Sequence, residues 1–177
     1  FAKVLVSVGR RPFTDGLDLE KGGIALTDRG FIAVDETGRT ANPRTFAAGD
    51  VAGNPMLAHK ATHEARALVA RFVGRAAHEL APVPAVVFTD PEIAWVGLTE
   101  TQAKEQGREI KVSKFPWAAS GRALTLDRAD GVTKILAEPG SGKLLGVAIA
   151  GPGAGDLISE ASLALASGAT AADLART

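Results

Sequence analysis

A chain of 177 residues with 46% hydrophobic and 23% charged residues can bury one large or two small cores, so a disordered tail is excluded. Basic and acidic residues each total 20, and this zero formal charge argues against binding to nucleic acid or to an anionic membrane. The sequence has no cysteine, which excludes a disulfide or thiolate nucleophile within this chain and fits a reducing, cytoplasmic compartment. The first residues do not read as a signal peptide, and no apolar run approaches the ~20 residues needed to cross a bilayer.

The first predicted element is a buried strand of a parallel sheet from Lys3 to Val8, an apolar β-branched run that Gly9 closes. Such a strand needs neighbours on both sides, so we expect the natural protein to extend upstream of Phe1. Further along, Ile24 to Leu26 and Phe31 to Val34 predict a small hairpin around a polar turn.

A second short strand is predicted from Thr45 to Ala48, ending in Gly49 and Asp50. After a turn rich in glycine, asparagine and proline, apolar residues recur at helical spacing from Leu57 to Val73. This spacing predicts an amphipathic helix that begins shortly after the acidic residue.

The composition changes at Pro82 to Pro84, and the pattern beyond this point favours an α+β domain. The five strands predicted there are Ala85 to Thr89, Ile93 to Leu98, Val112 to Phe115, Val132 to Ala137 and Leu144 to Ala150. Thr99 with Gln102 predicts a capping box that opens a helix, and Gly107 closes that helix.

Two helices are predicted at the end of the chain. Asp156 to Ala166 is an apolar helix with Asp156 as its N-cap and Gly168 after its last turn. Thr170 with Asp173 opens another helix, which we expect to be cut off at the end of the chain.

Three stretches resemble the pyridine nucleotide-disulfide oxidoreductase family. The first, VLVSVGRRP from Val4 to Pro12, is similar to the last strand of the family's NAD domain. The resemblance implies that Gly9 and Arg10 lie beside NAD, where only a residue without Cβ, such as Gly9, lets the backbone approach the dinucleotide closely. The alternative is an ordinary strand-ending glycine followed by solvated arginines.

The second stretch, TFAAGDVAGNPMLAHKATHEA, is similar to the family's second flavin motif in the form typical of dihydrolipoamide dehydrogenases. The resemblance implies that Asp50 accepts a hydrogen bond from a ribitol hydroxyl of FAD. It also implies that backbone N–H groups within Met56, Leu57, Ala58 and His59 face the O2 side of the flavin, where negative charge gathers on reduction. The alternative for the aspartate is a simple turn or helix-capping residue.

The third stretch comprises VFTDPEIAWVGLTETQAKEQG and KFPWAASGRA, which resemble the opening of the family's dimerisation domain. The resemblance implies a homodimer in which a second copy covers some of the apolar surface. Of Trp95, Phe115 and Trp117, we expect at least two to be core aromatics.

Together these stretches imply a fold of class α/β and α+β. Residues 1–12 would be the last strand of an NAD-binding domain and residues 13–82 the C-terminal part of an FAD-binding domain. Residues 83–177 would be an α+β dimerisation domain with a mainly antiparallel sheet, truncated at its C-terminus.

The implied activity is that of a flavoprotein that reoxidises dihydrolipoamide carried on the lipoyl domain of a 2-oxo acid dehydrogenase complex, with NAD as acceptor. The family's CxxxxC disulfide and HPxxxE base are absent from this sequence, so no catalytic residue is expected in it and the segment alone should be inactive. Alternatives are a glutathione-type or mercuric-type reductase, or a catalytically silent dimerisation module.

Three other patterns carry less information. His59 and His63 have a spacing that can hold zinc, but no third ligand suggests itself, so no metal site is predicted. Gly151 to Asp156 (GPGAGD) is not a GxGxxG loop and reads as a turn. His78 near Glu79 is expected to be exposed.

Overall fold

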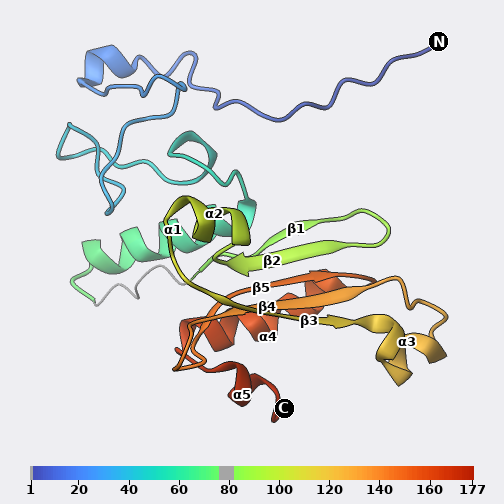
Figure 1. Cartoon of the computed structure of the whole chain (residues 1–177). Helices are drawn as coiled ribbons and strands as arrows, with labels where there is room; N and C mark the ends of the chain where they lie inside the picture. Colours follow the sequence, from blue (N-terminus) through green and yellow to red (C-terminus); the bar gives the residue numbers. More distant parts are fainter. Residues whose placement is uncertain (1, 76–81) are drawn as a thin grey trace. The chain divides into compact units, whose positions relative to one another are not determined.

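The structure, a computed structural model, describes residues 2–75 and 82–177 (Figure 1). The predictions for His78 and Glu79 lie outside these residues. The chain forms two compact units, residues 1–80 and 81–177, each described here by itself. Within the described part of the chain, no helix is both long and apolar enough to cross a membrane.

The first unit is built around one long helix. This helix, α1, spans Ala58–Phe72 and has Leu57 as its N-cap and Val73 as its C-cap, so the predicted helix is confirmed to within one residue at each end. Two short 3-10 helices precede it, η1 (Leu19–Gly22) and η2 (Gly49–Val51).

The extended segments of the first unit pair only briefly. The predicted hairpin is present as one antiparallel bridge, Leu26 to Ile32, and the predicted strand before η2 as one bridge, Arg39 to Phe46. The Phe46 ring packs edge-on against the ring of Phe72 at the far end of α1, with centroids 4.7 Å apart. This aromatic pair therefore joins the irregular segments to the helix.

The prediction of a strand from Lys3 to Val8 is wrong for this structure. Among the described residues, none forms a β-bridge with this segment, and Val4, Leu5 and Val8 are 82%, 91% and 91% exposed. The physical reason is that a central strand exists only through hydrogen bonds to neighbouring strands, which apolar composition cannot replace.

The second unit contains a five-stranded antiparallel sheet in the order β1-β2-β5-β4-β3. Its strands are β1 (Ala85–Val87), β2 (Ile93–Gly97), β3 (Lys111–Pro116), β4 (Val132–Ala137) and β5 (Leu144–Ala150). All five predicted strands are present, and β4 and β5 have the predicted bounds. The expectation of an α+β unit with a mainly antiparallel sheet is confirmed.

Helix α4 (Ala154–Ala166) packs against one face of this sheet, where β2 and β5 lie side by side (Figure 1). The buried residues of this core are Ala94, Val96, Leu144, Val147, Ile149, Ala154, Ile158 and Ala161. Small and β-branched side chains dominate, which lets a helix approach a pleated surface closely. Packing is so tight beside β5 that a Cβ on Gly146 would lie 2.0 Å from the Leu98 carbonyl oxygen.

Two short helices begin with the predicted capping boxes. The Thr99 hydroxyl accepts from the Gln102 backbone N–H at the start of α2 (Glu100–Glu105), and the Thr170 hydroxyl does the same for Asp173 at the start of α5 (Ala171–Leu174). Helix α5 ends at Leu174, so the expectation that it runs to the end of the chain is wrong.

Helix α4 begins differently from its prediction. Its N-cap is Gly153, with φ 72°, and Asp156 lies within the first turn, so the assignment of Asp156 as N-cap is wrong. Glycine has no side chain to cap a helix; instead, a Glu92 carboxylate oxygen accepts from the Gly155 backbone N–H at 2.9 Å. A residue 63 positions earlier in the chain therefore accepts a hydrogen bond from a backbone N–H that has no partner within the helix.

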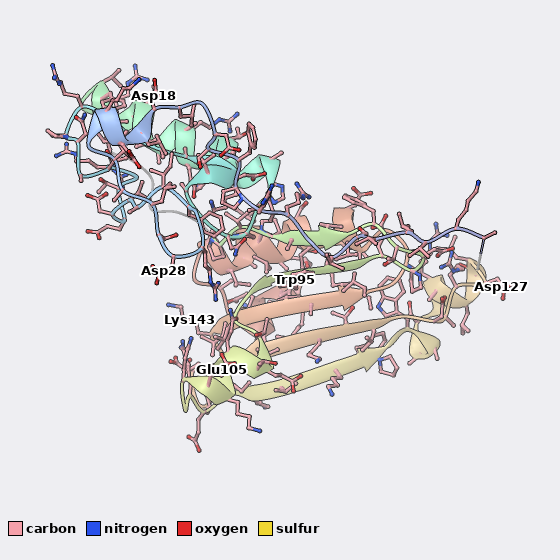
Figure 2. The ribbon with its side chains drawn as sticks, turned by 90° about the horizontal axis from the view of Figure 1, so that it is seen from above. Asp18, Asp28, Trp95, Glu105, Asp127 and Lys143 are labelled. Carbon is pink, nitrogen blue, oxygen red and sulfur yellow. The ribbon has the colours of Figure 1, made fainter. Side chains whose placement is uncertain are left out.

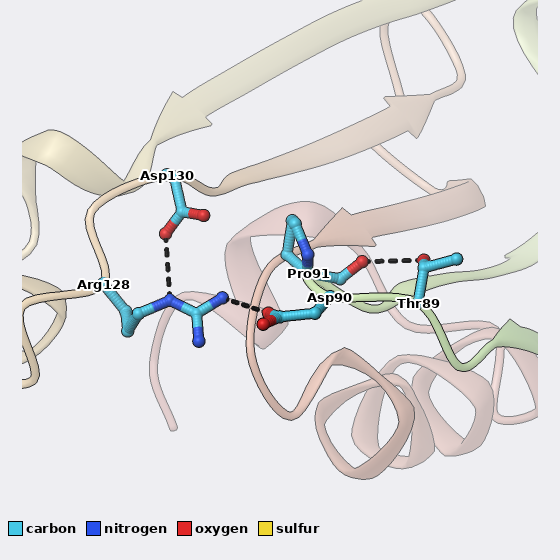
Figure 3. Close-up of polar contacts among 5 residues, drawn as sticks. All are labelled: Thr89, Asp90, Pro91, Arg128 and Asp130. Carbon is cyan, nitrogen blue, oxygen red and sulfur yellow. Dashed lines mark hydrogen bonds and ion pairs between the residues drawn. The ribbon is translucent and has the colours of Figure 1, made fainter.

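An arginine joins the turn between β1 and β2 to the segment before β4 (Figure 3). The Arg128 guanidinium donates to the carboxylates of Asp90 and Asp130. The hydrogen bond from Arg128 is the main reason that the pKa of Asp130 lies below its usual value. Helix α3 (Gly121–Thr125) and the 3-10 helix η3 (Trp117–Ala119) complete the connection from β3.

Replacing Glu92 with alanine should lower the free energy of unfolding by about 1–2 kcal/mol, because a helix N-terminus loses its acceptor. Urea denaturation of the two proteins measures this difference. Glu109→Ala, at an exposed position, is the control and should change stability by less than about 0.5 kcal/mol. Equal effects of the two substitutions would contradict the capping role.

Arg128→Gln should raise the pKa of Asp130 towards its usual value, as measured by a carboxyl ¹³C NMR titration. A lowered pKa in the folded state means that the ion pair stabilises the fold above the carboxylate's usual titration range. This contribution is lost as the pH falls through the lowered pKa. Asp173, whose pKa is lowered chiefly by the Thr170 hydroxyl, should not move and serves as an internal reference.

Candidate functional site

The candidate site lies where η2 meets the beginning of α1. Gly49, the first residue of η2, is buried and has φ +82°, a conformation that L side chains rarely adopt. A Cβ at this position would lie only 2.9 Å from the Cβ of Ala61 in α1. Only glycine therefore allows η2 to rest directly on the helix, and Asp50 follows at once in the chain.

The Asp50 carboxylate is accessible. Its side chain is 47% exposed, and the Arg10 guanidinium lies 4.0 Å from one carboxylate oxygen. An exposed ion pair at this separation contributes at most about 1 kcal/mol, so it does not compete strongly with a ligand for the carboxylate. The carboxylate can therefore accept hydrogen bonds from a bound molecule.

The residues predicted to face a flavin are at the N-terminus of α1. Leu57 is the N-cap, in an extended conformation, and Ala58 is the first helical residue. Met56 and Leu57 are half-buried, whereas Ala58 and His59 are exposed. Leucine has no side-chain oxygen, and no acidic residue occurs in the first turn. This terminus therefore keeps the partial positive charge of a helix without the usual side-chain cap.

The site also contains an ion pair between a buried lysine and a half-buried glutamate, which sequence reasoning missed. Lys60 is 8% exposed, and its Nζ lies 2.8 Å from a carboxylate oxygen of Glu64. Lysine and glutamate four residues apart in a helix usually form a solvated surface pair, so the spacing alone gave no reason to single them out. The signal that could have found them is their position on the helix face that bears Ala67, which is buried.

The structure brings most of the predicted residues together, with one exception. Asp50 and the residues from Met56 to His59 border the contact between η2 and α1, and Arg10 reaches Asp50. Gly9 has φ +116°, which favours glycine, but it is exposed and a Cβ there would meet no atom within 4 Å. Its proposed closeness to NAD therefore rests on the sequence alone.

No metal site is found among the described residues, since no three histidine or acidic side chains gather there. His63 lies one turn after His59 in α1, and its buried Nε2 has no hydrogen-bond partner among the residues that the structure describes.

The second unit carries an apolar pocket of about 510 Å³ next to the N-terminus of α4. Its apolar lining includes Phe115, Trp117, Leu126 and Leu157, of which Phe115 is 49% and Leu157 50% exposed. A surface of this kind on a monomer is typical of protein contact sites.

The expectation of at least two core aromatics is not met. Trp117 packs on the core cluster, and its indole N–H donates to Thr133. Trp95 comes from β2 (Figure 2), where Ala94 and Val96 contribute to the core under α4. Since side chains alternate along a strand, Trp95 lies on the opposite face of the sheet.

Comparison with known proteins agrees with the resemblance. The dimerisation domain of the pyridine nucleotide-disulphide oxidoreductases matches residues 83–177, and the pyridine nucleotide-disulphide oxidoreductase domain matches residues 1–65. Dihydrolipoyl dehydrogenase of Thermus scotoductus is 50% identical over 99% of this chain and 38% of its own length. Mitochondrial dihydrolipoyl dehydrogenase of Homo sapiens is 49% identical over 98% of this chain and 34% of its own length.

Solved structures share the fold. LpdA from Mycobacterium tuberculosis superimposes with a TM-score of 0.88 at 31% identity, over 97% of this chain and 38% of that one. The HOCl-induced flavoprotein disulfide reductase RclA from Escherichia coli gives 0.81 at 29% identity, over 93% and 38%. This chain therefore spans less than two fifths of the length of these relatives. Because the dimerisation-domain match alone covers more than half of the sequence, the chain belongs to the pyridine nucleotide-disulphide oxidoreductase family.

Proposed function

We propose that this chain is part of a flavin-dependent dihydrolipoyl dehydrogenase, which reoxidises protein-bound dihydrolipoamide to lipoamide and reduces NAD. The observation that carries the proposal is the direct packing of η2, with its accessible Asp50, on the uncapped N-terminus of α1. The relatives named dihydrolipoyl dehydrogenase, at 47–50% identity, support the choice of substrate.

The residues present fit FAD. The Asp50 carboxylate would accept a hydrogen bond from a ribitol hydroxyl, because an ionised carboxylate is an acceptor only. Backbone N–H groups near Ala58, within Met56 to His59, would donate to the electron-rich O2 edge of the ring system, where preorganised donors stabilise negative charge. FAD would supply the two-electron chemistry between a thiol pair and NAD.

The remaining parts of the proposal rest mainly on the family resemblance. Gly9 and Arg10 would lie beside NAD. A second copy of the chain would cover the apolar pocket around Phe115, Leu126 and Leu157, giving a homodimer. A lipoyl domain would be the reducing partner. A cytoplasmic location remains part of the proposal, although the mammalian relatives are named mitochondrial.

A related disulfide reductase is the second candidate. The fold similarity to the flavoprotein disulfide reductase RclA favours it, since the dimerisation and flavin elements are shared within the family. Assays of the complete protein with dihydrolipoamide, glutathione disulfide and mercuric ion distinguish the two. A third candidate, a catalytically silent dimerisation module, requires that the complete protein turn over none of them.

Asp50→Ala in the complete protein should weaken FAD binding by about 10-fold or more, because a charge-assisted hydrogen bond contributes about 1.5–3 kcal/mol. Flavin fluorescence during titration of the apoprotein with FAD gives the dissociation constant. Asp28→Ala, at an exposed turn residue of the same unit, is the matched control and should bind FAD like the parent protein. Equal affinities for all three proteins would overturn the role of Asp50.

The 177-residue segment alone should reduce NAD with dihydrolipoamide no faster than buffer, because it has no cysteine to form the redox disulfide. The measurement is NADH absorbance with added FAD. Turnover above the buffer rate would contradict the proposed division of labour between this segment and the rest of the protein.

A further inference from the structure

We propose that Lys60 and Glu64 are positioning residues, which hold Asp50 at the correct place relative to the N-terminus of α1 for FAD binding. This inference rests on the proposed function and deepens it, since neither side chain is assigned a contact with the cofactor. The two residues act on the cofactor only through the backbone that carries Asp50.

The ion pair between Lys60 and Glu64 holds the backbone on both sides of Asp50. One Glu64 oxygen lies 2.8 Å from Lys60 Nζ, and the other accepts from the Gly49 backbone N–H at 2.7 Å. Lys60 Nζ donates in turn to the carbonyl oxygens of Gly53, at 3.2 Å, and Gly49, at 3.5 Å. Two side chains from α1 thus hold the beginning and the end of the segment from Gly49 to Gly53.

Glycine at both ends of this segment explains why the contacts go to the backbone. Gly49 and Gly53 have no side chains by which the segment could be anchored, and both have positive φ angles of 82° and 146°. Glycine loses more conformational entropy on folding than any other residue, so ordering this segment costs free energy. Charge-assisted hydrogen bonds, roughly twice as strong as neutral ones, suit this task.

The ion pair lies at the beginning of α1, so its loss should affect the position of Asp50 more than the stability of the whole unit. Lys60 lies in the first turn of α1 and Glu64 in the next, whereas the aromatic contact between Phe46 and Phe72 secures the far end of the helix. Loss of the pair would therefore let η2 shift on the first turns while the rest of the unit stays packed. A cofactor that contacts Asp50 and the helix terminus together is sensitive to such a shift.

The experiment uses the complete FAD-binding protein and three variants: Lys60→Met, Glu64→Gln, and the double variant Lys60→Met with Glu64→Leu. Each single variant should raise the FAD dissociation constant at least about tenfold, which corresponds to about 1.4 kcal/mol. Lys21→Met is the matched control, because Lys21 is also 2.8 Å from its partner, Asp18, but both side chains are exposed. This control should bind FAD like the parent protein.

The double variant distinguishes positioning from stability. It leaves no unpaired buried charge, so its melting temperature should lie above those of both single variants, although the Gly49 backbone N–H loses its acceptor. Its FAD affinity should stay below that of the parent protein, and the midpoint potential of the bound flavin should be more negative than in the parent protein, because the flavin is no longer aligned with the helix N–H groups.

Recovery of both affinity and potential together with the melting temperature would overturn the positioning role. The same holds if the parent protein and all variants bind FAD equally. A parent protein that binds no FAD would instead refute the proposed function itself, and with it this inference.

Discussion

The first unit depends on the close approach of the backbone at Gly49 to Ala61, which no residue with a side chain could make. This contact places the segment from Gly49 to Gly53 against the first two turns of α1. Asp50 becomes a neighbour of a helix terminus that has neither a polar N-cap nor an acidic residue in its first turn. A negative acceptor and a set of positive donors are thereby displayed from adjoining elements, which is an arrangement suited to a ligand with both hydroxyl groups and electron-rich atoms.

The second unit depends on a different constraint, the alternation of side chains along its antiparallel strands. Ala94 and Val96 in β2 join the core under α4, and this leaves Trp95 to the other face. The same core leaves the surface near Phe115 and Leu157 partly exposed, although the residues behind it are among the best packed in the unit. A well-packed scaffold with an exposed apolar pocket is what a subunit contact requires.

Elements defined by local signals were predictable from the sequence. Strands β4 and β5 and the capping boxes at Thr99 and Thr170 depend on alternation and on residues three positions apart, and they were confirmed. The Gly-Asp string before a helix likewise predicted where the candidate site lies. Asp50 and the start of α1 are only a few residues apart in the sequence, so they must also be close in space.

Features that depend on contacts distant in sequence were not predictable. The apolar run from Lys3 to Val8 has the composition of a strand, but no described segment pairs with it, and no local pattern reveals this. The cap of α4 was assigned to Asp156, whereas Glu92 supplies it across the fold. The contacts of Lys60 and Glu64 were not predictable because their partners are backbone atoms of glycines. A sequence motif does not show which backbone groups a side chain will bind.

Strand β3 forms one edge of the sheet, and all of its residues are exposed. An exposed edge offers unpaired backbone groups that could template growth of a continuous sheet through many molecules. Lys111 and Lys114 place like charges along this edge, and Pro116 removes one N–H donor at its end. At the opposite edge, β1 is only three residues long. Both borders therefore resist fibrillar aggregation.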